Sequence, residues 1–230
     1  MTDPQKAIAK LRRPPAVHNW VKSLRRRRDA TAFALFNFAV NGPRHSLQKV
    51  TQIVGFVVFD GLSEDEALRC LSKISDPAAR TYGREILKAI VPWIKDRSLN
   101  GAQIFKDLCE YYRVSSDVAV PVRPTFVVRE DGKITPYFVI CWAKMDFDVY
   151  QKRILSTLIL DAILRLEEFA GSDAKIVCVP RYRNSKSERF VLDWSVTDYP
   201  PLDEHEKSEL FSRYELALSD AERMIIESLG

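Results

Sequence analysis

The sequence predicts an α+β protein, an α/β sandwich in which a helical N-terminal region precedes a small mixed β-sheet flanked by helices. Two observations support this class. Between residues 29 and 112 apolar residues recur at helical spacing, separated by capping and turn residues. After Val114 the pattern changes to short β-branched runs bounded by Pro and Gly. Helices, then β-β-α-β-β, then a last helix is an order typical of a mixed sheet covered by helices.

Composition limits the class of protein. Of the 230 residues 46% are hydrophobic and 29% are charged, as in ordinary soluble proteins. The longest apolar runs are too short to span a bilayer, and the first 15 residues lack the apolar core of a secretory signal. Four cysteines lie far apart, each within an apolar pattern: Cys70, Cys109, Cys141 and Cys178. We therefore expect buried free thiols, a cytoplasmic protein and no membrane partner.

The charge is unevenly distributed along the chain. Residues 1–50 hold eleven Lys/Arg against two Asp/Glu, a net charge of +9. Residues 201–230 hold three against eight, a net charge of −5, whereas the whole chain carries only +4. A basic head and an acidic tail can bind different partners or bind each other. The sequence leaves both alternatives open.

We divide the chain into a basic N-terminal segment (1–28), a helical region (29–113), an α/β core (114–200) and an acidic C-terminal helix (201–230). The first segment reads as a polar arm interrupted by Pro14 and Pro15. It ends in a cationic run that fits a phosphate backbone: Lys22, Arg25, Arg26, Arg27 and Arg28. The alternatives are a solvated or helix-capping cluster, or one paired with the acidic tail.

The helical region contains residues that typically begin or end helices. We predict helices over 46–59, from a capping box at Ser63 to residue 74, from Pro77 to a kink or end at Pro92, and over 102–112. The first two of these permit a helix-turn-helix. The second one, however, opens with three acidic residues, which argues against its use as a DNA-recognition helix.

The predicted sheet follows. Strands are expected over 117–128, 137–143, 175–180 and 190–196, with a hairpin turn at 130–133 in which Gly132 supplies a positive φ. A long helix is expected over 147–169, ended by Gly171. Neither a Gly-rich phosphate loop nor a G-x-S-x-G, C-x-x-C or H-E-x-x-H motif occurs, and the three histidines are far apart.

Residues 117–180 resemble the core of the PD-(D/E)XK nuclease superfamily, especially the N-terminal nuclease region of type I restriction motor subunits. The resemblance rests on Arg123-Pro124-Thr125, the Asp131-Gly132 turn, Trp142-Ala143-Lys144 and Gln151 early in the next helix. It covers about 64 residues, under a third of the chain. It implies a nuclease-like core for the sheet.

The resemblance also implies a Mg²⁺ site built from an Asp and a Glu, since Mg²⁺ takes oxygen ligands. Thr125 stands in place of the Asp and Trp142 in place of the Glu. A hydroxyl is a weak neutral ligand and an indole accepts nothing. We therefore expect no cofactor and no catalysis, with Thr125, Trp142, Lys144 and Gln151 as vestigial site residues.

Three functions remain. The first is a non-catalytic nuclease-like module that binds nucleic acid or joins a complex, using the basic run and the basic loop residues Arg181, Arg183 and Lys186. The second is an active Mg²⁺-dependent DNA nuclease whose carboxylates have migrated to Glu110, Glu130, Asp131, Asp146 or Asp148. The third is a protein-interaction or regulatory partner without nucleic-acid binding. A protein partner or a homo-oligomer is compatible with the first and third.

Overall fold

The computed structural model of the chain describes residues 3–42, 46–97, 99, 108–130 and 132–229. Within them it is a mixed α+β protein, as predicted. Its helices are α1 (Pro4–Leu11), α2 (Val17–Ser23), α3 (Arg28–Asn41), α4 (Gln48–Phe59), α5 (Glu64–Ser72), α6 (Pro77–Asp96), α7 (Val149–Ile159) and α8 (Glu204–Leu229). Its strands are β1 (Glu110–Arg113), β2 (Ala119–Val122), β3 (Phe126–Glu130), β4 (Lys133–Ile140), β5 (Lys175–Cys178) and β6 (Leu192–Ser195).

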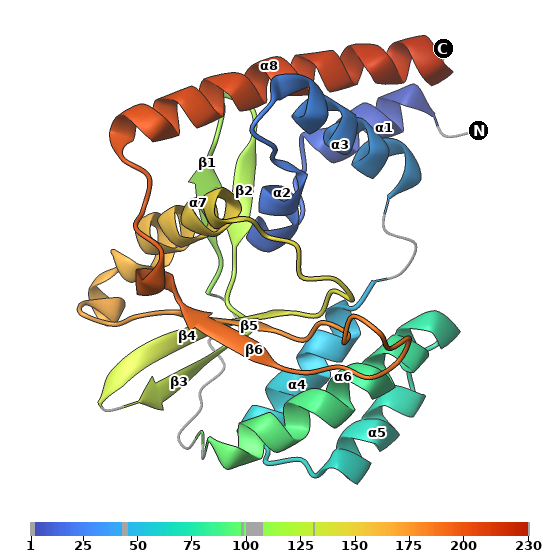
Figure 1. Cartoon of the computed structure of the whole chain (residues 1–230), viewed down its shortest axis with the longest axis vertical. Helices are drawn as coiled ribbons and strands as arrows, with labels where there is room; N and C mark the ends of the chain where they lie inside the picture. Colours follow the sequence, from blue (N-terminus) through green and yellow to red (C-terminus); the bar gives the residue numbers. More distant parts are fainter. Residues whose placement is uncertain (1–2, 43–45, 98, 100–107, 131, 230) are drawn as a thin grey trace.

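The main sheet has the strand order β3-β4-β5-β6. Strands β3 and β4 form an antiparallel hairpin whose turn contains Gly132 at φ 80°, as predicted. Strands β4 and β5 are parallel, with α7 between them in the chain, and β6 returns antiparallel to β5 (Figure 1). The loops that follow β4 and β5 therefore leave the sheet at the same edge.

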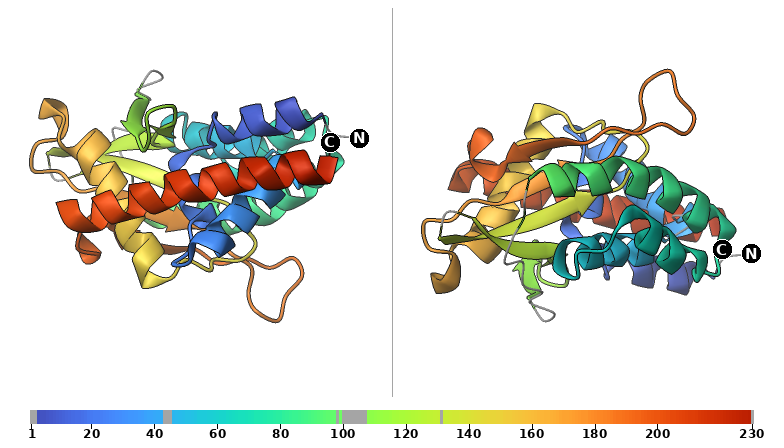
Figure 2. Two further views of the ribbon diagram at one scale, coloured as in Figure 1. Left: turned by 90° about the horizontal axis from the view of Figure 1, so that it is seen from above. Right: turned by 90° about the horizontal axis from the view of Figure 1, so that it is seen from below.

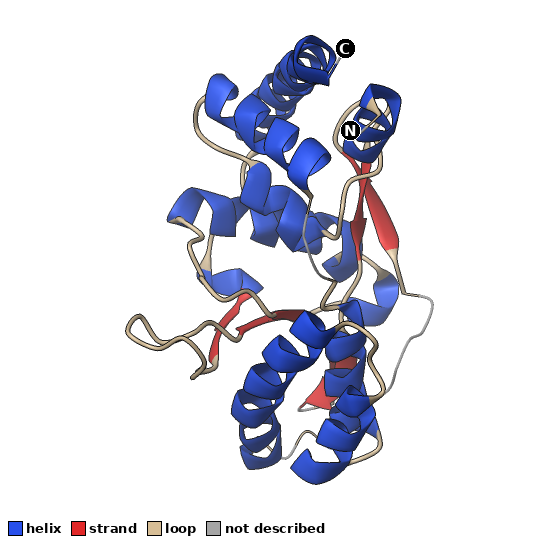
Figure 3. Ribbon diagram, turned by 90° about the vertical axis from the view of Figure 1, so that its right-hand side faces the viewer, coloured by secondary structure: helices blue, strands red, loops and turns tan. Residues whose placement is uncertain are grey.

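Side chains of the sheet alternate between two hydrophobic cores, because successive residues of a strand point to opposite faces. One face packs on α4, α5 and α6 through Phe126, Val128, Tyr137, Val139 and Val177. The other packs on the layer that holds α1, α2, α3, α7 and α8 through Val127, Phe138, Ile140, Ile176 and Cys178. The four-stranded sheet thus lies between two helical layers (Figure 3). The predicted helical region 29–113 contributes helices to both layers.

The predicted helix over 102–112 is wrong at its end. Residues 110–113 are strand β1, paired antiparallel with β2 in a separate two-stranded sheet. The rest of that prediction falls on 102–107, outside the described residues, and on Leu108 and Cys109, which are not helical. Val120 and Val122 of β2 are fully buried, so the hairpin gains from β-pairing and from packing together.

Two other expectations about helices are corrected. The N-terminal arm is partly helical: Asp3 caps α1 with Pro4 at its first position, and Ala7 and Leu11 are buried. The long helix predicted over 147–169 is regular only to Ile159, and a π-helical turn follows over Leu160–Leu164. In that turn the Asp161 carboxylate binds Lys207 of α8 at 3.1 Å and Arg165 at 2.7 Å.

Helices α4 to α6 follow their sequence signals closely. Ser63 and Glu66 form the predicted capping box of α5, and Asp76 and Pro77 open α6. Pro92 does not end α6, which continues to Asp96 because Ile90, Val91 and Ile94 bury its inner face. No helix in the described ranges is long and apolar enough to cross a membrane.

Candidate functional site

Thr125, which the resemblance aligns with a nuclease Asp, forms hydrogen bonds within the sheet. Thr125 directly precedes β3, and its hydroxyl accepts a hydrogen bond from the backbone N–H of Val139 at 2.9 Å. Its own N–H donates to the carbonyl of Tyr137 at 2.7 Å. The hydroxyl thus extends the β3-β4 ladder by one step and has a structural role in the sheet.

Trp142 and Lys144 do not lie on a strand. The strand expected over 137–143 ends before both residues, because β4 runs only to Ile140. The indole N–H of Trp142 donates to Asn19 of α2 at 3.1 Å, and its ring lies edge-on to Phe147 at 5.1 Å. The Lys22 ammonium lies 4.1 Å from the same ring. Trp142 therefore docks helix α2 onto the loop 141–148.

Gln151 connects α7 to the same helix. The side chain is 4% exposed, and its amide donates to the carbonyls of Val21 at 3.3 Å and Leu24 at 2.8 Å. Its oxygen accepts from the N–H of Asp148, which caps α7. These bonds satisfy carbonyls at the end of α2, where intrahelical partners are missing.

Helix α2 therefore contacts two of the four residues that the nuclease resemblance singles out. His18 of α2 lies 5.7 Å from the Trp142 ring, and burial lowers the pKa of His18 to about 4. Lys144, by contrast, is exposed and forms no ion pair within the described ranges. The four candidate residues therefore differ in their surroundings. Thr125, Trp142 and Gln151 make contacts within the protein, whereas Lys144 faces solvent.

Three of the five proposed migrated carboxylates have other partners. Glu130 accepts from the Tyr137 hydroxyl at 2.5 Å, Asp146 lies 3.5 Å from Lys22, and Asp148 caps α7. Glu110 lies on β1 in the separate sheet, and Asp131 is outside the described residues. Among the residues that the structure describes, no three His, Cys, Asp or Glu side chains are grouped so that they could hold a metal ion.

Most of the basic run is bound within the chain. Arg25 donates to the carbonyls of Lys22 and Leu24, Arg27 pairs with Asp29, and Arg28 holds Asp220 of α8 through bonds of 2.6 and 2.7 Å. The bond from Arg28 lowers the pKa of Asp220. Arg26 is the exception: it lies over the Tyr150 ring and pairs with no carboxylate among the described residues.

The basic head and acidic tail meet in the fold. Besides the Arg28–Asp220 pair, Arg12 of α1 donates to Glu222 of α8 at 3.1 Å. Helices α1 and α3 both pack along α8 (Figure 1). Two cations of the head thus pair with two carboxylates of the tail, as expected for the alternative in which the two ends of the chain bind each other.

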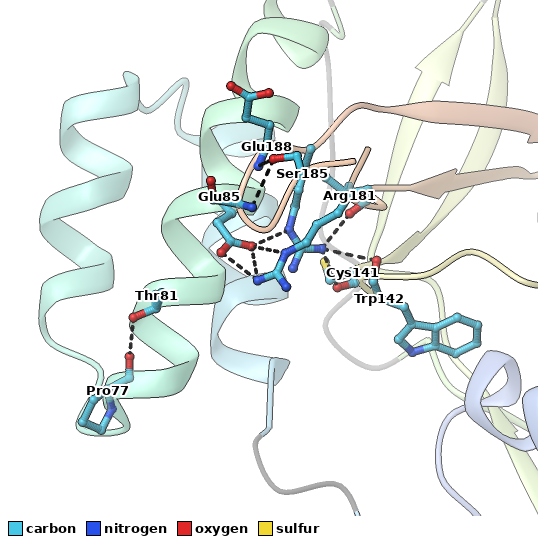
Figure 4. A network of polar contacts seen from close by, with 11 residues as sticks. Pro77, Thr81, Glu85, Cys141, Trp142, Arg181, Ser185 and Glu188 are labelled. Atoms are coloured by element: carbon cyan, nitrogen blue, oxygen red, sulfur yellow. Dashed lines mark hydrogen bonds and ion pairs between the residues drawn. The ribbon is translucent and has the colours of Figure 1, made fainter. Parts of the chain in front are cut away.

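The loop after β5 is anchored by a buried ion-pair network that the sequence did not indicate. Glu85 of α6 accepts from Arg181 at 2.7 Å and from Arg189 at 3.0 Å (Figure 4). Arg189 also donates to the carbonyls of Cys141, Trp142 and Val179. Burial lowers the pKa of Arg189, against the opposing effect of Glu85. Sequence offers little signal for this partner, since Glu85 lies on a helix 96 residues before Arg181.

The tip of that loop stands away from the body of the molecule (Figure 2). Arg183 and Lys186 at the tip are exposed and form no ion pair with any described residue. The loop is tied to the one after β4, because the N–H of Arg181 donates to the carbonyl of Ala143 at 3.0 Å. We call the three free cations Lys144, Arg183 and Lys186 the basic edge.

No protein-family model, no curated protein and no solved structure matches this chain.

Proposed function

We propose that the chain is a non-catalytic, nuclease-like protein that binds nucleic acid through the basic edge. One observation carries the proposal: three exposed cations without ion-pair partners among the described residues lie on two loops bonded to each other. Those loops follow neighbouring parallel strands, β4 and β5. Ligands of α/β sheets commonly bind beyond the carboxyl ends of the strands. Unpaired cations can also replace the counterions of a phosphate backbone.

The absence of catalysis is proposed from the vestigial residues. Thr125 uses its hydroxyl in the sheet, and Trp142 uses its indole N–H to hold α2. Neither supplies the carboxylate oxygens that Mg²⁺ takes. A module that keeps a nuclease-like scaffold without these ligands retains the means to bind phosphates but not to activate water.

The test is binding of labelled DNA and RNA oligonucleotides by fluorescence anisotropy at about 50 and about 200 mM salt. We expect affinity to fall with salt. The triple variant Lys144→Gln/Arg183→Gln/Lys186→Gln should lower affinity by roughly tenfold or more and reduce the salt slope by about 2 to 3, since each phosphate contact contributes about 0.9 on duplex DNA. Equal affinity of variant and parent would contradict the proposal.

The matched control removes the same charge elsewhere. Lys6 and Arg13 of the N-terminal part and Arg223 of α8 are exposed and lie on other elements. Lys6→Gln/Arg13→Gln/Arg223→Gln should leave the salt slope nearly unchanged.

In parallel, plasmid DNA incubated with Mg²⁺ or Mn²⁺ should stay intact, and nicking that disappears in Lys144→Ala would show that the protein is a nuclease.

A second candidate is a protein-interaction or regulatory partner without nucleic-acid binding. It is favoured by the pairing of Arg12 with Glu222 and of Arg28 with Asp220, which uses cations that a nucleic acid would otherwise attract. No binding to either nucleic acid at low salt, together with a stoichiometric protein complex recovered at high salt, would select this candidate.

A further inference from the structure

A surface pocket of about 400 Å³ lies between the start of α7, the first half of α8 and the connection from α2 to α3. Its volume is within the range of small-molecule sites in proteins. Three of its seven lining side chains are arginines, one from each of these segments. The lining consists of Arg26, Val149, Tyr150, Arg153, Glu206, Glu209 and Arg213.

Two of the arginines contact the same aromatic ring. The guanidinium carbon of Arg26 lies 5.7 Å from the centre of the Tyr150 ring, and that of Arg213 lies 5.8 Å from it. Arg213 also donates to the Tyr150 hydroxyl at 2.6 Å. Across the described ranges neither guanidinium pairs with a carboxylate, so most of their N–H donors remain available.

The third arginine of the pocket, Arg153, is already bound within the protein. Arg153 donates to both oxygens of Glu206, at 2.8 and 2.6 Å, and to the carbonyls of Pro200 and Pro201. This bidentate bond lowers the pKa of Glu206. Arg153 and Glu206 therefore neutralise each other and fix one wall of the pocket to the start of α8.

The remaining lining charges are Arg26, Arg213 and Glu209, a net charge of +1. The Glu209 carboxylate lies 3.3 Å from Nε2 of His205. An anion that enters the pocket meets two free guanidinium groups positioned by one ring. Val149, which is 63% exposed, adds an apolar contact beside them.

We propose that this pocket binds a phosphate monoester, with Arg26 and Arg213 as donors to the phosphate oxygens. Guanidinium groups present paired donors that match phosphate geometry. The pocket is larger than one phosphate requires, so an organic group fits against Val149 and Tyr150. Two sources share this chemistry: a free small molecule such as a mononucleotide, and the phosphorylated end of a nucleic acid. The proposal uses none of the basic-edge residues and holds or fails independently of the proposed function.

The experiment is isothermal titration calorimetry of the whole chain with inorganic phosphate, a nucleoside 5′-monophosphate and the matching nucleoside. We expect saturable binding of the monophosphate and none of the nucleoside. R26Q and R213Q should each weaken binding about tenfold or more. The matched control is R27Q, which removes the neighbouring charge from an arginine that is paired with Asp29 and does not line the pocket.

A short oligonucleotide with a 5′-phosphate and the same oligonucleotide with a 5′-hydroxyl distinguish the two sources. Preference for the phosphorylated end that R26Q abolishes identifies the nucleic-acid end, whereas binding of the monophosphate alone identifies a small molecule. Arg26 is exposed and donates to no backbone carbonyl of the residues that the structure describes, so R26Q should fold like the parent. Absence of saturable binding by every phosphate compound, or equal weakening by R26Q and R27Q, would overturn the proposal.

Discussion

The guanidinium of Arg189 lies where two strand ends, two loops and a helix meet. Its side chain is 1% exposed, and it binds Glu85 together with carbonyls that follow β4 and β5. These carbonyls lie beyond the paired part of the sheet, and a buried carbonyl without a donor costs free energy. Arg189 thus donates hydrogen bonds to backbone carbonyls that strand pairing does not reach.

We predict that Arg189→Gln lowers the free energy of unfolding by about 3–5 kcal/mol, because it leaves Glu85 and the carbonyls buried without this donor. Arg181→Gln is the matched control: Arg181 binds the same carboxylate, but its side chain is 22% exposed. Its loss should cost about 1 kcal/mol. Urea denaturation measures both. Equal losses in the two variants would show that Arg189 does not have this special role.

Individual site residues could be found in the sequence, but their contacts could not. Thr125 and Trp142 stand out because they depart from the nuclease pattern. What they do depends on Val139 across the hairpin and on Asn19, 123 residues earlier in the chain. Likewise, the basic run could be identified in the sequence. Only the fold distinguishes Arg28, which pairs with α8, from Arg26, which pairs with no carboxylate of the described residues.

At the scale of elements, helices α4, α5 and α6 approach closely at a glycine. A methyl group on Gly83 of α6 would lie 2.4 Å from Leu71 of α5 and 3.0 Å from Val50 of α4. Both neighbours are buried. The glycine lets three helices pack on one face of the sheet at a distance that a larger residue would not allow.

We predict that Gly83→Ala destabilises the protein by about 1–3 kcal/mol through overpacking. Gly55→Ala, in α4, is the control, since its methyl group would meet only Phe59 at an ordinary 3.8 Å. It should be neutral or stabilising by up to about 1 kcal/mol, the helix-propensity gain from Gly to Ala. Thermal unfolding followed by circular dichroism compares the two. A similar shift in both variants would contradict close packing at Gly83.

Elements with local signals were predicted well. The capping box at Ser63, the Asp76-Pro77 start and the Gly132 turn each act within a few residues, so the sequence contains what decides them. Strand β1 and the π-helical turn were missed because contacts outside each segment decide them. Strand β1 needs β2, and Asp161 in the π-helical turn binds Lys207, which lies 46 residues later.

At the scale of the whole molecule, the N-terminal segment is part of the fold and not an appended arm. Trp20, Val21 and Leu24 are at most 1% exposed and belong to the core that also contains α7 and α8. The opposite charges of the head and tail reinforce this packing at the surface. The class of the fold was predictable from periodicity, but the layer in which each helix lies was not.

We predict that a chain beginning at residue 29 does not fold cooperatively. It lacks six buried apolar residues, each worth about 1–3 kcal/mol, against a typical total stability of about 5–15 kcal/mol. Those residues are Ala7, Leu11, Val17, Trp20, Val21 and Leu24. Far-UV circular dichroism with a urea titration measures this. Removal of residues 1 and 2 alone, which keeps the α1 cap Asp3, is the control. A sharp transition in the chain that begins at residue 29 would contradict the prediction.

The position of α2 has a consequence for ligand affinity. Helix α2 is held by Trp142 and Gln151, so a ligand that contacts those two side chains must bind a minority of molecules in which α2 has moved away. The observed dissociation constant then equals the intrinsic one divided by that fraction. If displacement costs about 4 kcal/mol, affinity falls roughly a thousandfold. Substitutions that loosen α2 would tighten such binding while lowering stability, a trade-off that double mutants can quantify.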